Sequence, residues 1–157
     1  MTLALPSPVH LRVAARLLQA GAVIAYPTEG VWGLGCDPMN EAAVRRLLDL
    51  KQRSEAKGLI IIAGCMQQVE GWLTGLSPAQ RAACAATWPG PYTWVVPAES
   101  APQWLRGNHD SVAVRVTAHP GVQALCHAFG GALVSTSANV SGKPPARDAL
   151  ALRQQFG

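Results

Sequence analysis

Apolar residues recur along this chain at two spacings, one typical of helices and one typical of strands. Leu11, Ala14 and Leu18 recur at intervals of three and four, which places them on one face of a helix. Residues 59–63, LIIIA, form a continuous apolar run of the length expected for a buried strand. The pattern therefore predicts helices and strands that alternate and pack around a common core.

Capping and turn residues set the limits of the other expected elements. Ser-Pro pairs at 7–8 and 77–78 are typical helix starts, Asn40 can cap a further helix, and Gly130 is a typical helix end. We expect strands at residues 22–26, 32–36, 59–63, 92–96, 112–116 and 132–136. We expect helices at residues 8–20, 41–50, 66–73, 77–87, 120–129 and 148–156.

Several links between successive strands are too short to hold a helical crossover. The strands therefore cannot all be parallel. We predict an α/β fold with a single domain, residues 1–157, built on a twisted sheet of mixed parallel and antiparallel strands flanked by helices. Nothing in the sequence indicates an internal repeat or a linker between domains.

Composition limits the class of protein further. The chain has 157 residues, of which 49% are hydrophobic and 14% charged, so it can bury a substantial core and is not a disordered segment. Its four cysteines lie far apart without a CxxC pair, which favours reduced thiols in a cytoplasmic protein. The apolar runs are too short to span a bilayer, and prolines interrupt the stretch 1–15 that a signal peptide would need, so we expect no membrane association.

Positive charge is concentrated in a short segment after the second expected helix. Lys51, Arg53 and Lys57 lie within seven residues, interrupted by one acid, Glu55. Cations at a helix end often only cap its last carbonyls and lie in solvent. That explanation covers Lys51 better than Lys57, so the segment is either a solvated helix end or an anion-binding site. The net charge of +4 allows a polyanionic partner but does not require one.

Common signatures of nucleotide and metal sites are missing from the sequence. There is no GxxxxGK[ST] motif, and the segment 33–35 lacks the third glycine of a dinucleotide-binding turn. The histidines form no HExxH or Cys/His cluster, so we predict no metal ligands from the protein. No GxSxG segment indicates a serine nucleophile.

Five segments, taken together and in order, carry a more specific signal. They are YPTEGVWGLGCD at 26–37, LKQRSEAKGLIII at 50–62, WPGPYTWV at 88–95, DSVAVRV at 110–116 and LVSTSANVSGKPP at 133–145. In this combination the chain resembles the YrdC-like (TsaC) threonylcarbamoyl-AMP synthase family, whose signature joins a Lys-x-Arg to a Ser-x-Asn. The matching residues are Lys51 with Arg53 and Ser137 with Asn139.

The resemblance implies a YrdC-like fold with a concave basic cleft and an enzyme of the nucleotidyltransferase class. Such an enzyme condenses L-threonine, bicarbonate and ATP into threonylcarbamoyl-AMP and pyrophosphate, and magnesium accompanies the ATP. A separate threonylcarbamoyl transferase complex then modifies tRNA beside the anticodon, so tRNA is an expected partner, directly or through that complex. We expect a monomer or a weak homodimer.

The resemblance also assigns residues to the nucleotide. Lys51 and Arg53 would be catalytic by holding phosphate oxygens, and the expected ATP-binding residues are Lys51, Arg53, Lys57, Ser111, Ser137 and Asn139. Adenylate formation requires positioned reactants and neutralised charge but no protein nucleophile, which suits these residue types. The alternative for the polar segment is a turn in which Ser137 and Asn139 hydrogen-bond their own backbone.

A second group of residues is expected to bind threonine. Arg115 is a cation inside an apolar strand, where an unpaired charge is costly, so a substrate carboxylate is a suitable partner. The alternative is an internal ion pair with Asp110 or Glu29. By resemblance, Thr28 and Ser135 hold the rest of the amino acid.

The sequence departs from the family pattern at several points. Gly30 replaces a threonine of many relatives, and Lys57-Gly58 replaces an Asn-Pro, so contacts made by those side chains are not transferred. Family members continue beyond the helix that ends at Phe156 with a segment that contributes to the pocket, and we expect that segment to be absent here. Thr93, in the GPYT turn, either lies near the nucleotide or only stabilises its strand.

Two other functions share parts of this pattern. A non-catalytic module that binds tRNA or double-stranded RNA would also use a concave basic surface. A carbamoyl-transfer domain within a larger enzyme would share the fold, but it would normally lie beside zinc-finger-like Cys pairs, which this sequence lacks.

Overall fold

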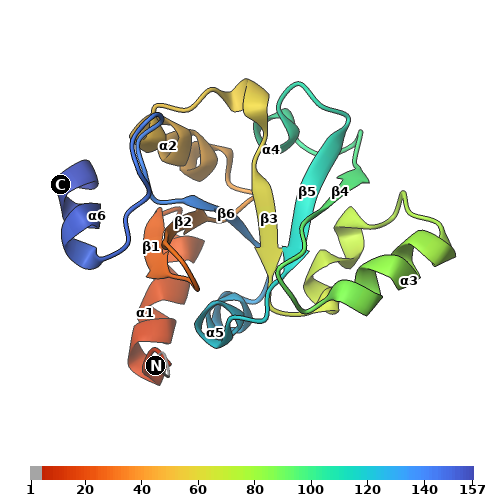
Figure 1. Ribbon diagram of the computed structural model, residues 1–157, viewed down its shortest axis with the longest axis horizontal. Helices are drawn as coiled ribbons and strands as arrows, with labels where there is room; N and C mark the ends of the chain where they lie inside the picture. The colour runs from red at the N-terminus through yellow and green to blue at the C-terminus, as the bar shows by residue number, and fades with distance from the viewer. Residues whose placement is uncertain (1–4) are drawn as a thin grey trace.

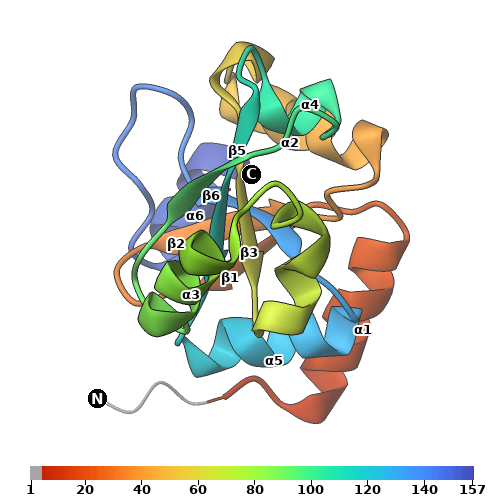
Figure 2. The ribbon, with the colours of Figure 1, turned by 90° about the vertical axis from the view of Figure 1, so that its right-hand side faces the viewer.

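The sheet of this protein has six strands, with helices packed around it (Figures 1 and 2). The structure, a computed structural model, describes residues 5–157. The strands are β1 (Ile24–Pro27), β2 (Trp32–Cys36), β3 (Ile60–Ala63), β4 (Trp94–Pro97), β5 (Ser111–Val116) and β6 (Leu133–Ser137). The α-helices are α1 (Pro8–Gln19), α2 (Glu41–Lys51), α3 (Pro78–Thr87), α4 (Gln103–Arg106), α5 (Pro120–Phe129) and α6 (Ala149–Phe156), and the 3₁₀ helices are η1 (Glu55–Lys57) and η2 (Met66–Trp72).

The strand order confirms the predicted mixed sheet. From one edge to the other it is β1-β2-β6-β3-β5-β4, as Figure 1 shows from left to right. Strands β3 and β5 pair in parallel, and the other neighbouring pairs are antiparallel. The chain between the parallel strands β3 and β5 holds the helices η2, α3 and α4 and the strand β4. The antiparallel strands β1 and β2 are joined by a short turn, because only antiparallel neighbours can be linked so directly.

The main core lies on one face of the sheet. Along β5, Val112, Val114 and Val116 are buried, while the alternating residues Ser111, Ala113 and Arg115 are only partly buried. Successive side chains of a strand point to opposite faces, so the valines enter the core and the other three face outward. Helix α2 supplies apolar partners to that core. The sheet thus has one fully packed face and one face that carries polar side chains.

Helices α1 and α5 cover part of the second face. They pack against each other and form a smaller apolar cluster over the sheet that includes Leu18, Tyr26, Ile62 and Leu125. In both views α5 lies at one end of the sheet, and α2 and α4 lie at the other (Figures 1 and 2). The polar part of the second face is therefore left open next to this cluster.

Side-chain caps fix the predicted helix starts. Ser7 accepts a hydrogen bond from the backbone of His10, and Ser77 forms a full capping box with Gln80. Asn40 caps α2 by accepting from the backbone of Ala43. These three starts agree with the sequence prediction because each depends on contacts within one turn.

Several element limits differ from the prediction. The first strand begins at Ile24 and not at 22, because the backbone N–H of Ala22 still bonds to the last turn of α1. The fourth begins at Trp94 and not at 92, because the carbonyl of Tyr92 accepts from the indole of Trp88 and not from the sheet. The segment predicted as a helix at 66–73 is the 3₁₀ helix η2, and neither η1 nor α4 was predicted.

The N-terminal stretch considered as a possible signal peptide includes residues 1–4, which lie outside the described residues. Within residues 5–157, no helix combines the length and the apolar character needed to cross a bilayer.

Candidate functional site

The predicted threonine-binding residues lie around one cavity on the open face of the sheet. This cavity, of about 160 Å³, is called the Arg115 cavity here. Its polar lining comes from Thr28, Glu29, Arg115, Thr117, Ser135, Thr136 and Ser137. The strands bring these residues together because β6 pairs with both β2 and β3, and β3 pairs with β5.

A second cavity, of about 260 Å³, contains most of the predicted cationic residues and is called the Arg53 cavity here. Its polar lining comes from Arg53, Lys57, Arg106, His109 and Ser111. Ile60 lines both cavities, and its neighbours across the sheet are Ser135 and Ala113. The two cavities therefore adjoin on the same face of the sheet.

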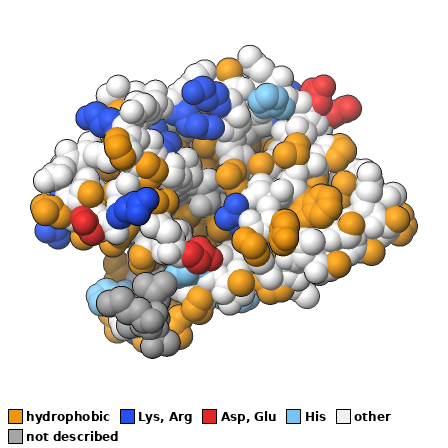
Figure 3. Space-filling view, in the orientation of Figure 1, with side chains coloured by type: hydrophobic (Ala, Val, Ile, Leu, Met, Phe, Trp, Pro, Cys, Tyr) orange, Lys and Arg blue, Asp and Glu red, His pale blue; other side chains and the backbone are white. Residues whose placement is uncertain are grey.

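Figure 3 shows this face as a hollow near the middle of the molecule, with Lys and Arg side chains along its upper rim and a His side chain beside them. An acidic side chain lies on the lower side of the hollow. Glu29 lines the Arg115 cavity, so its lining is not purely cationic. That this surface functions as a basic cleft stays a prediction.

Arg115 is oriented by a neighbouring hydroxyl group. Its Nε donates to Oγ1 of Thr93 at 2.8 Å. Within residues 5–157, no carboxylate lies within 4.0 Å of its guanidinium, and Asp110 lies instead 3.9 Å from Arg106. The internal ion pair considered from the sequence is therefore not formed. The hydrogen bond to Thr93 sets the direction of the other guanidinium donors, and because Thr93 is neutral it does not compensate the charge of Arg115. Thr93 belongs to the site through this contact.

Lys51 joins the two signature segments. Its side chain is only 2% exposed, and its ammonium donates to the carbonyls of Ser137 and Asn139, the latter at 2.8 Å. Asn139 Oδ1 lies a further 3.5 Å from the same ammonium. Burial, together with the charge of Arg53, lowers the pKa of Lys51 to about 8. Lys51 is thus not a solvated helix end, and it lines neither cavity.

The polar segment after β6 bonds mainly to itself. Ser137 Oγ donates to Asn139 Oδ1 at 2.6 Å, and Asn139 Nδ2 donates to the carbonyls of Val140 and Lys143. This is the self-bonded turn that the sequence left open as an alternative. Ser137 nevertheless lines the Arg115 cavity, whereas Asn139 does not.

Arg53 has a fixed position with spare donors. Its Nη2 donates to the carbonyl of Gly58 at 3.1 Å, while its buried Nε has no hydrogen-bond partner among the described residues. A buried donor without a partner is costly and is uncommon in folded proteins. Its position on the wall of the Arg53 cavity suits it to an anionic ligand.

The other two predicted threonine-binding residues, Thr28 and Ser135, are held by hydrogen bonds within the protein. Thr28 Oγ1 donates to the carbonyl of Val31 at 2.5 Å, and Ser135 Oγ accepts from the hydroxyl of Tyr26 at 2.8 Å. Burial raises the pKa of Tyr26, so this hydroxyl stays protonated and keeps its role as a donor. Sequence reasoning missed Tyr26, although it opens the YPTEG segment.

The aromatic ring of Tyr26 also accounts for the glycines of β2. A Cβ built on Gly35 would lie 2.7 Å from the carbonyl oxygen of Val134 and 2.9 Å from the Tyr26 ring. A side chain at this position would displace the ring or open the sheet. The glycine therefore allows the ring to lie flat on the strand and to reach Ser135.

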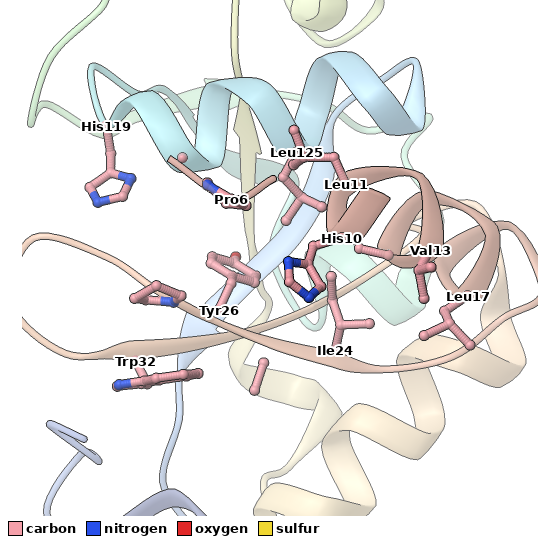
Figure 4. A pocket seen from close by; sticks show the side chains of 14 residues that line it. Pro6, His10, Leu11, Val13, Leu17, Ile24, Tyr26, Trp32, His119 and Leu125 are labelled. Atoms are coloured by element: carbon pink, nitrogen blue, oxygen red, sulfur yellow. The ribbon is translucent and has the colours of Figure 1, made fainter. Parts of the chain in front are cut away.

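A larger cavity, of about 580 Å³, lies elsewhere, between α1, β1 and the start of α5 (Figure 4). Figure 4 shows mainly apolar side chains around it, and polar atoms belong to His10, Tyr26, Trp32 and His119. None of its lining residues is Lys, Arg, Asp or Glu. A triphosphate needs charge neutralisation, so the two smaller cavities are the better candidates for the reaction.

Protein ligands for a metal ion are not gathered in the described part of the chain. No group of three or more His, Cys, Asp or Glu side chains there could hold an ion. This finding concerns direct protein ligands only.

The chain matches a known protein family over most of its length. Residues 16–157 match the Sua5/YciO/YrdC family, described as "Telomere recombination". The chain belongs to the Sua5/YciO/YrdC family. The resemblance drawn from the five sequence segments is thereby confirmed.

Relatives in the Sua5/YciO/YrdC family carry a common name. The threonylcarbamoyl-AMP synthase of Chromohalobacter salexigens is 59% identical over 145 residues, which cover 92% of this chain and 78% of the relative. The threonylcarbamoyl-AMP synthase of Methylococcus capsulatus is 56% identical over 151 residues, covering 96% of this chain and 81% of the relative.

A solved structure of the Sua5/YciO/YrdC family has nearly the same fold. The crystal structure of P. abyssi Sua5 complexed with L-threonine superposes with a TM-score of 0.86 at 33% identity. The match covers 94% of this chain and 44% of the Sua5 chain, so the present chain spans less than half of that protein. This match supports the predicted fold.

Proposed function

We propose that this protein is a threonylcarbamoyl-AMP synthase, an enzyme that condenses L-threonine, bicarbonate and ATP and releases pyrophosphate. The observation that carries the proposal is the pair of adjoining cavities on one sheet face. Arg115 lies in one cavity and Arg53 and Lys57 lie in the other, and Ile60 borders both. The names of two similar relatives support this assignment. In this proposal the protein is a nucleotidyltransferase.

In this proposal, threonine occupies the Arg115 cavity. The guanidinium of Arg115 binds the substrate carboxylate with the donors that Thr93 leaves free, since Thr93 uses only Nε. Ser135 and Thr28 line the same cavity and bind the amine and hydroxyl groups of the amino acid. The 160 Å³ volume suits a small amino acid.

ATP, as its magnesium complex, binds beside threonine with its phosphates in the Arg53 cavity. Arg53 and Lys57 neutralise the phosphate oxygens, Ser111 adds a hydroxyl group, and Ser137 approaches from the Arg115 cavity. Lys51 and Asn139 hold the loop that presents Ser137, because their polar groups bond within that loop. Arg53 remains the proposed catalytic residue. Lys51, which was predicted to be catalytic as well, is instead a positioning residue that acts through the backbone it holds.

The reaction then needs little from the protein beyond position and charge. The threonine amine joins bicarbonate with loss of water, and an oxygen of the resulting carbamate attacks the α-phosphorus. The bond between the α-phosphorus and the bridging oxygen breaks, and pyrophosphate leaves with the electron pair. The cations of the Arg53 cavity stabilise the departing charge.

We extend the proposal to the partners and the location of the protein. The threonylcarbamoyl group of the adenylate then passes to tRNA beside the anticodon, directly or through a threonylcarbamoyl transferase complex, and AMP leaves. The protein acts as a monomer or a weak homodimer in the cytoplasm. Four free cysteines, three of them buried, support a reducing compartment.

The test is pyrophosphate release that depends on threonine and bicarbonate, compared in Arg115→Met and Arg81→Met. Arg81 is a matched control because it lies on the surface of α3 and pairs with Glu70. We expect Arg115→Met to raise the KM for threonine at least tenfold, as for the loss of a charge-assisted hydrogen bond. Equal turnover in both variants would contradict the proposal, and salt-dependent RNA binding without ATP or threonine binding would favour an RNA-binding module.

A further inference from the structure

Two turns that are far apart in the sequence are joined at the Arg53 cavity. The backbone N–H of Leu59 donates to the carbonyl of Leu105 at 2.9 Å, and that of Asn108 donates to the carbonyl of Ala56 at 3.1 Å. Gly107 lies between them with a φ of +62°, and a Cβ built on it would lie 2.5 Å from the carbonyl oxygen of Ala56. The turn at 105–110 is therefore locked against η1 and the segment that carries Arg53 and Lys57.

This contact adds two basic side chains to the same cavity. Arg106 and His109 line it beside Arg53 and Lys57, and no Asp or Glu is among its lining residues. The nearest acid of the turn, Asp110, has a side chain that is 88% exposed and lies 3.9 Å from Arg106. Solvent screens a pair of this kind, so it neutralises little of the charge within the cavity.

Arg106 is positioned by the backbone of its own turn. Its Nε donates to the carbonyl of Ala101 at 3.1 Å, and its Nη1 donates to the carbonyl of His109 at 2.9 Å. Arg53 lines the same cavity, and its buried Nε has no hydrogen-bond partner among the described residues. Cations held this closely repel one another, and an anion with several oxygens would relieve the repulsion and fill the spare donors.

We propose that Arg106 and His109 bind the pyrophosphate portion of ATP together with Arg53 and Lys57. This inference rests on the proposed function, which requires the α-phosphorus to face threonine across Ile60. The two outer phosphates then extend away from the Arg115 cavity into the Arg53 cavity. The turn at 105–110 thus completes the subsite that holds the leaving group.

The test measures binding of inorganic pyrophosphate by calorimetry to the full chain and to Arg106→Gln, His109→Ala and His127→Ala. Glutamine keeps a donor for the carbonyl of His109 but removes the charge. We expect pyrophosphate to bind roughly tenfold more weakly to Arg106→Gln, as for loss of a charged hydrogen-bond donor. For His109→Ala we expect a loss of about threefold, because the side chain is exposed and screened.

His127 is the matched control, since it is exposed on α5 and lines neither cavity. Threonine binding, measured on the same variants, should stay unchanged and so shows that the fold is intact. Unchanged pyrophosphate binding in both Arg106→Gln and His109→Ala would overturn the inference even if the protein makes the adenylate. Competition of adenosine alone with pyrophosphate would also overturn it, because the cavity would then hold the base.

The proposed function can fail separately. Weaker pyrophosphate binding in Arg106→Gln, combined with no threonine-dependent pyrophosphate release by the unmodified chain, would support the anion subsite and contradict the synthase.

Discussion

The contact between Thr93 and Arg115 shows how a single hydroxyl group can set the direction of a charged side chain. Arg115 projects from a strand whose other face is in the core, and Thr93 holds its Nε at 2.8 Å. A guanidinium offers five donors in a fixed plane, so a bond at Nε fixes the direction of the remaining four. Thr93 is accordingly a positioning residue.

Replacing Thr93 by valine should weaken threonine binding without removing the charge. The change keeps the shape of the side chain and deletes the acceptor for Arg115. We expect the KM for threonine to rise about tenfold, the size of one hydrogen bond to a charged group, while kcat changes little. The threonine dependence of pyrophosphate release measures both values, with the exposed Thr74→Val as control. An unchanged KM for threonine would mean that Thr93 does not contribute to the threonine site.

Lys51 should give the protein a pH-dependent stability. Burial, and then Arg53, lower its pKa to about 8, whereas the unfolded chain has the ordinary lysine pKa of about 10.5. Between these values the unfolded chain binds more protons than the folded protein, so the contribution of Lys51 to the free energy of unfolding rises with pH. Urea unfolding at several pH values between 7.5 and 10.5 should therefore show that the free energy of unfolding of the unmodified chain rises with pH relative to that of Lys51→Met.

The control for that measurement is Lys143→Met, which changes an exposed lysine. Its difference from the unmodified chain should stay flat over the same range. If the free energy of unfolding of the unmodified chain instead falls with pH relative to that of Lys51→Met, the carbonyls of Ser137 and Asn139 stabilise the ammonium more than burial destabilises it.

At the scale of elements, the junction between η1 and the turn after α4 depends on a glycine. Gly107→Ala would force a side chain into a left-handed conformation and within 2.5 Å of the Ala56 carbonyl oxygen. We expect a loss of about 3 kcal/mol in the free energy of unfolding, the upper range for a strained backbone. Gly71→Ala is the control, because a Cβ there meets nothing within 4 Å. Similar unfolding midpoints for the two variants would argue against a locked junction.

The elements that the sequence predicted well are those set by contacts within one turn. The starts of α1, α2 and α3 follow from caps at Ser7, Asn40 and Ser77. The limits of β1 and β4 were shifted because backbone groups bond to a neighbouring turn, which a local pattern does not reveal. The short helix α4 was missed for the same reason, since four residues show no helical period.

Some residues of the candidate site were predicted from the sequence, and others are brought to it only by contacts between distant segments. The five segments predicted Arg53 and Ser137 as site residues through their resemblance to a family, and Arg115 was predicted as a cation inside an apolar strand. The sheet brings the three residues to one face. Arg106 lay outside those segments and enters the cavity only because two distant turns pack together. Thr93 lay inside them, but its role became definite only with the hydrogen bond to Arg115.

At the scale of the whole molecule, the proposed reaction depends on two cavities that share Ile60 as a lining residue. Ile60 lies between Ser135 and Ala113 on the open face, so a larger side chain there would separate the cavities without disturbing the main core. We expect Ile60→Phe to lower kcat at least tenfold, because even a small misplacement of reacting groups is costly. Threonine and pyrophosphate, each measured alone by calorimetry, should bind as they do to the unmodified chain.

Leu150→Phe is the matched control, since Leu150 is 66% exposed on α6 and lines neither cavity. The expected result is that Ile60→Phe still binds threonine and pyrophosphate but loses turnover. If turnover by Ile60→Phe equals that of the control, the carbamate and the α-phosphorus do not meet over Ile60, and the reacting groups must approach each other by another route. If the affinities for threonine and pyrophosphate fall together with turnover, the phenylalanine has reshaped the cavities. Ile60→Leu, a smaller change than Ile60→Phe, then tests the same junction.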